Sequence, residues 1–208
     1  IARGHYRGPL HGIPIALKDL VDTAGVATTY GSKAFKDRVP SADATLVTRL
    51  KTAGCINLGK LTMSELAMVG PPGFGKETLN PWNTSHAPGG SSSGSATAVA
   101  AGLCAGSIGS DTGGSIRFPA ANNNIVGLMP TYGRVSRKGV MPLSWTLDHV
   151  GPMTRTVEDA ALMLNAISGF DPADRTTSTE SVSDFRSELS PDIKGLKIGI
   201  LEDSLVDI

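Results

Sequence analysis

Two glycine- and serine-rich segments enclose a run of small residues: PGGSSSGSA (residues 88–96) and SDTGGSIRFP (residues 110–119). A flexible linker is one explanation for such a composition. The residues between the segments, 96–108, are mostly apolar and have to be buried, so we reject the linker. We instead predict a helix over residues 94–104, a short buried strand over residues 105–110, and a second helix that begins near Gly114.

The two segments could also bind a phosphate group through backbone N–H groups at the start of a helix. The sequence contains neither the GxxxxGK[ST] pattern nor GxGxxG, so this function is not favoured. A serine nucleophile fits better. Ser115 follows two glycines, and this turn lets the backbone N–H groups of Thr112, Gly113, Gly114 and Ser115 converge on a developing oxyanion.

A serine nucleophile needs a base. His149 is next to Asp148, but adjacent side chains do not face each other on a helix and point in opposite directions on a strand. Lys18 ends an apolar run, and burial there would lower its pKa and so favour the neutral amine. The residues alone leave a simple solvated lysine as the alternative.

The rest of the chain alternates expected strands and helices, which predicts an α/β fold. We expect strands over residues 13–20, 55–61 and 195–201, and helices over residues 43–53 and 156–167, the last with Thr156 as its N-cap. Residues 171–192 are polar and resemble a connector. The whole chain, residues 1–208, is expected to form one domain.

Composition excludes several classes of function. Nineteen basic residues balance nineteen acidic ones, so no nucleic-acid or membrane partner is expected. The longest apolar stretch, residues 98–106, is too short to cross a bilayer, and with no visible signal peptide we expect a cytoplasmic protein. Cys104 is expected to pack as a small hydrophobe, and the histidines lack the usual zinc spacings.

The chain resembles the amidase signature family, whose members hydrolyse amides with a Ser–Ser–Lys triad. Long, ordered motifs carry the resemblance. They are GPLHGIPIALKD (8–19), NPWNTSHAPGGSSSGSA (80–96), DTGGSIRFPAA (111–121), GLMPTYGRVS (127–136) and LDHVGPMTRTVEDA (147–160). The resemblance implies a mixed sheet flanked by helices on both faces, and it implies neither a metal nor an organic cofactor.

The resemblance also assigns roles to individual residues. Lys18 would be the base, Ser91 would follow a cis peptide bond and shuttle protons, and Ser115 would be the nucleophile. The remaining assignments form three groups: an oxyanion hole (Thr112, Gly113, Gly114 and Ser115), supporting residues (Asp111, Arg117 and Ser92) and a substrate-binding stretch (Met68, Val69 and Gly70). Ser93 and Ser95 are expected to cap the helix that follows.

The sequence departs from the family pattern at a few places. Asn122, Asn123 and Asn124 stand where the family usually has an aromatic or small residue and often a cysteine, and Met129 replaces a usual lysine. Phe118 stands where amidotransferase A subunits usually have glutamine, which favours a plain amidase over a tRNA-dependent amidotransferase.

Family domains are about twice as long as this chain, which starts at Ile1 and ends just after an expected strand. We therefore expect a fold that is incomplete at both ends, in a fragment of a longer chain or in a homo-oligomer that hides the open sheet edge. Three functions stay open: an amide hydrolase acting on a small-molecule amide, a glutaminase-type subunit of an amidotransferase, and a non-catalytic module that retains the fold.

Overall fold

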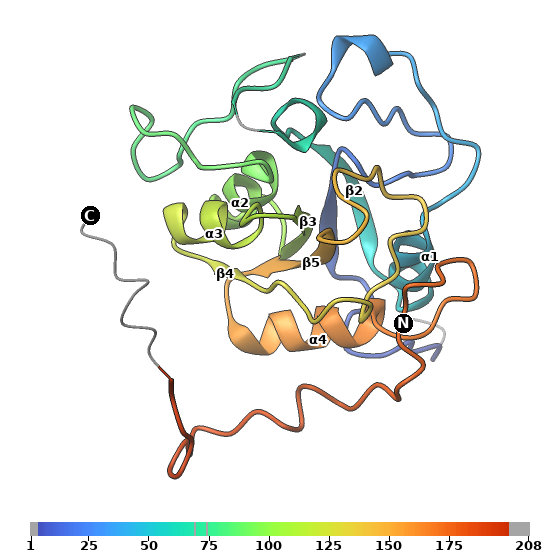
Figure 1. The fold of residues 1–208 in the computed structure, drawn as a ribbon, viewed down its shortest axis with the longest axis vertical. Coiled ribbons are helices and arrows are strands. Elements are labelled where there is room, and N and C mark those ends of the chain that lie inside the picture. The colour runs from blue at the N-terminus through green and yellow to red at the C-terminus, as the bar shows by residue number, and fades with distance from the viewer. Residues whose placement is uncertain (1–3, 69, 74, 200–208) are drawn as a thin grey trace.

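The computed structural model describes residues 4–68, 70–73 and 75–199. A five-stranded mixed sheet with the strand order β2-β1-β3-β5-β4 forms its centre (Figure 1). β1 pairs in parallel with β2 and β3, whereas β5 is antiparallel to β3 and β4. The strands are β1 (Pro14–Lys18), β2 (Ile56–Leu61), β3 (Gly106–Asp111), β4 (Val126–Gly127) and β5 (His149–Thr154).

Helices cover both faces of this sheet, as the resemblance predicted. They are α1 (Thr45–Thr52), α2 (Ser93–Ala100), α3 (Arg117–Asn122) and α4 (Val157–Ile167), with short 3-10 helices at Lys33–Phe35 and Glu65–Ala67. Side chains alternate between the two faces of a strand. Ile15 and Leu17 of β1 pack with α1 and α4, while Ala16 between them packs with α2.

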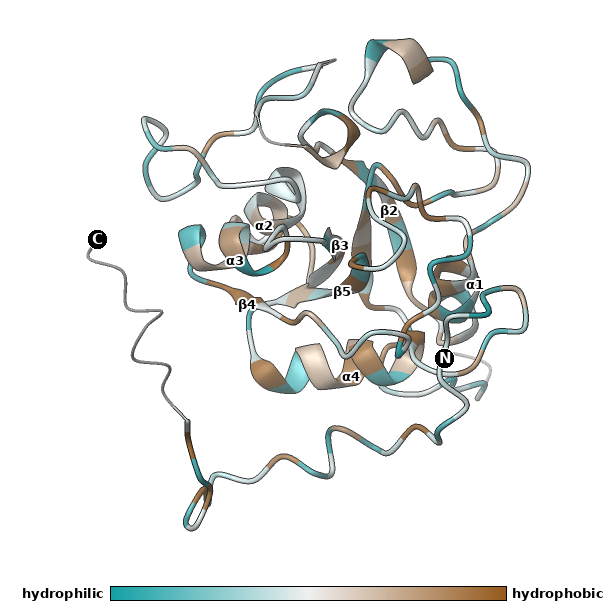
Figure 2. Cartoon of the chain, in the orientation of Figure 1, coloured by the Kyte–Doolittle hydropathy of each residue, from teal (hydrophilic) through white to brown (hydrophobic). Residues whose placement is uncertain are grey.

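The two faces differ in the size of the side chains they bury. The α1 and α4 face buries large aliphatic residues, including Leu46, Leu50 and Ile167. The α2 and α3 face buries mostly small ones, and Cys104 packs there beside Ala98 and Val99, as predicted. In Figure 2 most of α4 has the colour of hydrophobic residues, whereas hydrophobic and hydrophilic colours alternate along β2. Small side chains on the α2 face let this helix approach the sheet closely.

α2 is shorter than predicted, because the chain leaves the helix at Gly102. This glycine has φ +72°, the left-handed conformation that commonly follows a helix C-terminus. The N–H of Leu103 then donates to the carbonyl of Ala98, and the N–H of Gly102 to that of Val99. The sequence thus contains a glycine stop signal, which the run of alanines around it obscured.

The prediction that Ser93 and Ser95 cap α2 was wrong. The N-cap is Ser92, without a side-chain cap bond, and both serines lie within the helix. The Ser95 hydroxyl instead donates to the carbonyl of Ile108 at 3.0 Å, and the Ser107 hydroxyl donates to the carbonyl of Ser95 at 2.9 Å. These buried hydroxyls fasten α2 to β3, which is the strand that leads into the second glycine-rich segment.

The predicted strand over residues 195–201 is also wrong for the part that is described. Residues 195–199 pair with no described strand, and Leu196 and Ile198 are 70% and 81% exposed. Residues 200 and 201 lie outside the described residues. A strand requires a neighbouring strand edge for its backbone hydrogen bonds, and this segment has none in the described part of the chain.

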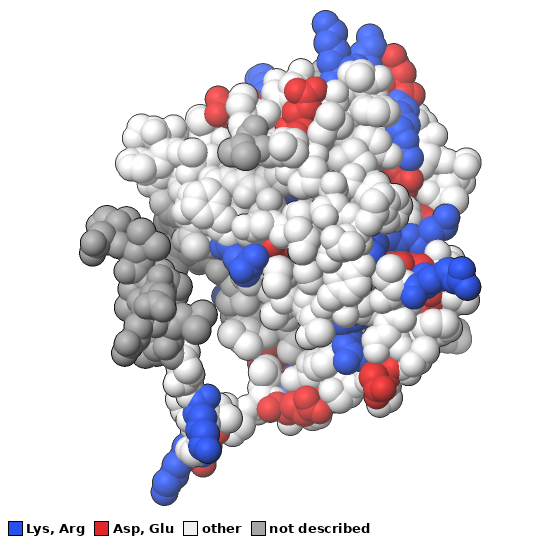
Figure 3. Space-filling model, viewed as in Figure 1, with Lys and Arg blue, Asp and Glu red and all other residues white. Residues whose placement is uncertain are grey.

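Residues 171–192 contain no helix or strand, and the segment after α4 runs along the outside of the sheet and helices (Figure 1). Its beginning is nevertheless fastened, because the Asp171 carboxylate accepts hydrogen bonds from Ser136 at 2.5 Å and Thr45 at 2.6 Å. On the face in Figure 3, charges of both signs are interspersed, mostly towards the rim.

We predict that Thr156→Ala lowers the free energy of unfolding by about 1 kcal/mol, because an N-cap hydroxyl is lost. Thr156 caps α4 as the sequence indicated, and its Oγ1 accepts a hydrogen bond from the N–H of Asp159 at 3.1 Å. Urea denaturation followed by circular dichroism measures the change. Thr156→Ser keeps the acceptor and serves as the control, so equal losses in both variants would contradict the capping role.

Candidate active site

Lys18 ends β1 with its side chain fully buried. Its amine donates hydrogen bonds to three hydroxyls: Ser91 at 2.7 Å, Ser92 at 2.9 Å and Ser110 at 2.9 Å. The parallel pairing of β1 with β3 brings Ser110 to the end of β1, and Ser91 and Ser92 come just before α2, with Ser92 as its N-cap. The sheet therefore surrounds one amine with three uncharged oxygen atoms.

Burial lowers the pKa of Lys18 to about 7, although the charges of Asp111 and Asp148 act in the opposite direction. An ordinary lysine has a pKa near 10.4 and is charged at neutral pH. No carboxylate is hydrogen-bonded to Lys18; all its partners among the described residues are neutral hydroxyls. At pH 7 a large fraction of this amine is therefore uncharged. The ammonium donates to all three hydroxyls, whereas the neutral amine donates to two of them and has a lone pair that can accept a proton from the third.

The loop before α2 holds Ser91 and Ser92 in place through backbone contacts. The Gly90–Ser91 peptide bond is cis, as the resemblance implied. The carbonyl of Ser91 accepts a hydrogen bond from the N–H of Ser64 at 3.1 Å, and the N–H of Ser92 donates to the carbonyl of Ser115 at 3.3 Å. This last bond joins the two glycine-rich segments next to both candidate hydroxyls.

Ser115 lies half-buried between β3 and α3, and it lines the same cavity as Ser91. Among the described residues its hydroxyl has no hydrogen-bond partner. The structure thus forms the contact between Lys18 and Ser91 and leaves the contact between Ser91 and Ser115 unformed. Catalytic hydrogen bonds of this kind are often long or misaligned when no substrate is bound.

Asp111 organises the turn around Ser115. Its carboxylate accepts hydrogen bonds from the backbone N–H groups of Gly114 at 2.7 Å, Ile116 at 3.0 Å and Arg117 at 3.3 Å. The Arg117 guanidinium binds both carboxylate oxygens, at 3.1 and 3.0 Å. Burial would raise the pKa of Asp111, but the bonds from Arg117 and the backbone outweigh it and hold the pKa below its ordinary value.

One residue of the predicted oxyanion hole does not fit that role in this structure. The N–H of Gly114 is occupied by Asp111 and is not free to meet an oxyanion. The N–H groups of Thr112, Gly113 and Ser115 have no partner in the described part of the chain. Three donors therefore remain next to the Ser115 hydroxyl.

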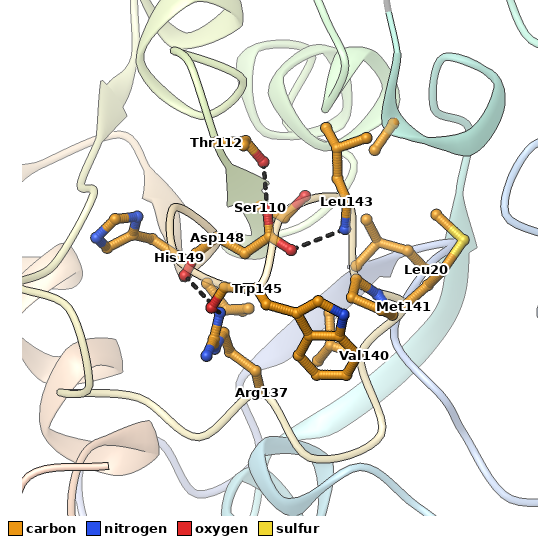
Figure 4. Close-up of a pocket in the computed structure, with 13 residues that line it drawn as sticks. Leu20, Ser110, Thr112, Arg137, Val140, Met141, Leu143, Trp145, Asp148 and His149 are labelled. Carbon is orange, nitrogen blue, oxygen red and sulfur yellow. Dashed lines mark hydrogen bonds between the residues drawn. The ribbon is translucent and has the colours of Figure 1, made fainter. Parts of the chain in front are cut away.

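Asp148 holds Thr112 in place, although the sequence alone assigns Asp148 no role in the site. Asp148 accepts a hydrogen bond from the Thr112 hydroxyl at 2.6 Å, and also from the backbone N–H groups of Leu143 and Ser144 (Figure 4). Thr112, Leu143 and Asp148 border a small cavity of about 20 Å³. His149 points away from this cluster and packs edge-on against Tyr132, with ring centroids 5.7 Å apart.

Ser110 is the other site residue that sequence reasoning missed. It stands just before Asp111 in the SDTGGS motif, where its place in a strand gave no sign that it faces Lys18. The supporting role expected for Ser92 has a clear geometric basis, since its hydroxyl accepts from Lys18 and also donates to the carbonyl of Ser110 at 3.2 Å.

A cavity of about 570 Å³ opens in front of Ser91 and Ser115. Met68 and Gly70 line it, which agrees with their expected position, while Val69 lies outside the described residues. Phe118 and Leu143 add apolar walls, and Glu77 is the only charged side chain among the described lining residues. A cavity of this size can hold a small organic molecule.

None of the described helices is long and apolar enough to span a membrane. Within the described ranges, no group of three or more His, Cys, Asp or Glu side chains is placed to hold a metal ion.

The chain is similar to proteins of known kinds over its whole length. It is 50% identical over 209 residues to the A subunit of the glutamyl-tRNA(Gln) amidotransferase of Carboxydothermus hydrogenoformans, covering 100% of this chain and 43% of that protein. The corresponding A subunit of Moorella thermoacetica is 52% identical over 205 residues, which cover 96% of this chain and 41% of the relative. The chain thus spans about two fifths of the length of these relatives.

Solved structures show the same likeness. The native peptide amidase from Stenotrophomonas maltophilia superimposes with a TM-score of 0.86 at 48% identity, over 89% of this chain and 40% of the peptide amidase. The glutamyl-tRNA(Gln) amidotransferase A subunit from Thermotoga maritima gives a TM-score of 0.82 at 43% identity, over 86% and 40% of the two chains. All of residues 1–208 match the family described as Amidase, and the chain belongs to this family.

Proposed function

We propose that the protein is an amide hydrolase in which Ser115 is the nucleophile, Ser91 relays protons and Lys18 is the base. The hydrogen bond of 2.7 Å between the buried amine of Lys18 and the Ser91 hydroxyl carries this proposal. A buried lysine that is held by three hydroxyls stabilises the fold poorly, because removing its charge from water is costly. We infer that this lysine is buried because burial keeps its amine neutral, and a neutral amine can act as a base.

The proposed reaction has two stages. Lys18 takes a proton from Ser91 while Ser91 takes the proton of Ser115, whose oxygen attacks the amide carbonyl and forms a tetrahedral intermediate. The relay then returns a proton to the leaving nitrogen, the C–N bond breaks, and an acyl-enzyme remains on Ser115. Water attacks the ester through the same relay and releases a carboxylate, so the net change is an amide and water to a carboxylic acid and an amine.

The oxyanion of the intermediate would be held by the free N–H groups of Thr112, Gly113 and Ser115. Thr112 is kept in place by its bond to Asp148, and the turn after it is kept in place by Asp111. Donors that are fixed before the reaction need no reorganisation when the charge develops, and the loss of one such donor costs about 2.7–4 kcal/mol of transition-state stabilisation.

The identity of the relatives supports a second candidate function, the glutaminase-type A subunit of an amidotransferase. This function would require partner subunits that receive ammonia, whereas a plain amidase releases it into solution. Phe118 distinguishes the two in sequence, and in the structure its exposed ring lines the cavity. An apolar ring here favours an amide with an apolar acyl group over glutamine, whose acyl group carries a charged ammonium and a carboxylate, and this supports the amidase.

Ammonia release tests this choice. We expect the isolated protein to release ammonia from simple aliphatic or aryl carboxamides faster than from glutamine, measured with a coupled glutamate dehydrogenase assay. Turnover confined to glutamine and stimulated by the addition of partner subunits would instead establish the amidotransferase function.

Ser115→Ala should abolish both hydrolysis and covalent labelling by a fluorophosphonate probe, because the nucleophilic oxygen is missing. Peptide mapping of the labelled wild-type protein by mass spectrometry should place the adduct on Ser115. Ser85→Ala, which changes an exposed serine on the neighbouring loop, is the matched control and should retain activity. Labelling of another serine in the wild type would refute the assignment of the nucleophile.

The rate should rise with pH through about 7, because the base acts only as the neutral amine and the ammonium form dominates below the lowered pKa of Lys18. Lys18→Ala should reduce kcat/KM by roughly 10²–10⁴-fold and remove this inflection. The pH dependence of kcat/KM measures both effects.

Lys60→Gln is the control for Lys18, since burial also lowers the pKa of Lys60, to about 8, yet this lysine pairs with Asp19 away from the three serines. Its variant should keep the inflection near pH 7. If the inflection near pH 7 were lost in Lys60→Gln and kept in Lys18→Ala, Lys18 would not be the base.

A further inference from the structure

Asn123 ties the end of α3 to the loop that carries Ser91. Its side chain is fully buried, and its Nδ2 donates hydrogen bonds to the carbonyl of Pro88 at 2.7 Å and to the carbonyl of Pro119 at 2.8 Å. Pro88 lies three residues before Ser91, and Pro119 lies within α3, which begins two residues after Ser115. One amide group thus connects the two segments that bear the serine pair.

The orientation of this amide is settled by its surroundings. Asn123 Oδ1 is buried without a hydrogen-bond partner in the described part of the chain. The reverse orientation would direct Oδ1 at the two carbonyl oxygens of Pro88 and Pro119, where only repulsion results. The side chain therefore makes two donated hydrogen bonds while its own oxygen stays unpaired. The two bonds to the carbonyls of Pro88 and Pro119 are what this side chain contributes to the structure.

Two further side chains hold the same end of α3. Asn80 Nδ2 donates to the carbonyl of Asn122 at 2.8 Å, and Trp82 Nε1 donates to the carbonyl of Asn123 at 2.8 Å. The last carbonyls of a helix lack partners within the helix, so side chains that bind them fix its end. We call Asn80, Trp82 and Asn123 the α3 clamp.

The loop touches α3 directly between these bonds. Gly89 has φ +76°, and a Cβ atom at this position would lie 3.0 Å from Pro119 Cα and 3.1 Å from Asn122 Nδ2. Only a glycine allows this approach. Ser115 therefore lies just before the first turn of α3. The loop that leads to Ser91 packs against this helix at Pro119 and is bonded at its end by Asn123.

We propose that Asn123 is a positioning residue, which sets the place of Ser91 relative to Ser115 by fastening the loop at Pro88 to α3. The proposal rests on the proposed function for its kinetic consequence. It also gives a role to Asn123, one of the residues at which the sequence departs from its family.

Asn123→Ala and Asn123→Asp test the proposal together. The first removes the side chain, and the second keeps its volume while directing an acceptor at the two carbonyls. Asn165→Ala is the matched control. Asn165 Nδ2 also donates to a backbone carbonyl, that of Ser183 at 2.6 Å, and its Oδ1 is also buried with no partner among the described residues, but Asn165 lies on α4.

Two measurements are needed, both on the full chain well below its Tm and normalised to folded protein by circular dichroism. Hydrogen exchange followed by mass spectrometry should show faster exchange over residues 89–92 in both Asn123 variants and not in Asn165→Ala. Amide hydrolysis should show kcat reduced roughly a hundred-fold with a smaller rise in KM, because the displaced loop carries the relay serine and also forms part of the cavity wall.

The outcomes separate the possibilities. Unchanged exchange over residues 89–92 would show that Asn123 does not fasten the loop at Pro88 and would overturn the proposal. Faster exchange with an unchanged kcat would overturn the positioning role and leave Asn123 as a stabilising residue like Asn165. If the wild type hydrolysed no amide, the proposed function would fail, and the exchange comparison would still decide whether Asn123 fastens the loop.

Discussion

The cost of burying the Lys18 amine is the constraint on which the rest of the site depends. A lysine that is buried from solvent and has no ion pair needs neutral partners for its hydrogen bonds. Those hydroxyls come from three places: Ser91 and Ser92 at the start of α2, and Ser110 in β3. The parallel pairing of β1 with β3 and the close approach of α2 are therefore requirements of this one amine, as well as features of the fold.

The same requirement explains why small residues dominate one side of the sheet. Ala16, Ala98 and Val99 let α2 approach the strands, and the Ser95 and Ser107 hydroxyls fasten it there with two bonds to backbone carbonyls. Larger side chains at these places would move Ser91 and Ser92 away from Lys18. The large aliphatic residues are on the opposite face, against α1 and α4, where no polar group has to be reached.

The sequence allowed much of this to be predicted, because hydrophobic periodicity and capping are local signals. The strands near Lys18 and Asp111 and the cap at Thr156 followed from them. The hydrogen-bond partners of the side chains could not be predicted in the same way, because they depend on how distant segments pack together. Ser95 bonds to β3 instead of capping its helix, and Ser110 faces Lys18 only because of the sheet register. The strand expected over residues 195–201 has an apolar pattern, but in the described residues no neighbouring strand edge.

The N–H of Gly114 is bound by Asp111, so in the proposed oxyanion hole the rigidity of the turn and the binding of an oxyanion would compete for the same donor. Asp111 uses three backbone N–H groups and Arg117 to hold the turn, and its lowered pKa keeps it ionised as an acceptor. Without this carboxylate all three N–H groups, that of Gly114 included, would lose their acceptor, and only the bond of Thr112 to Asp148 would still hold the start of the turn. Preorganised donors stabilise developing charge better than mobile ones, so in the proposed mechanism the N–H of Gly114 would favour the transition state by bracing the turn that carries Gly113 and Ser115.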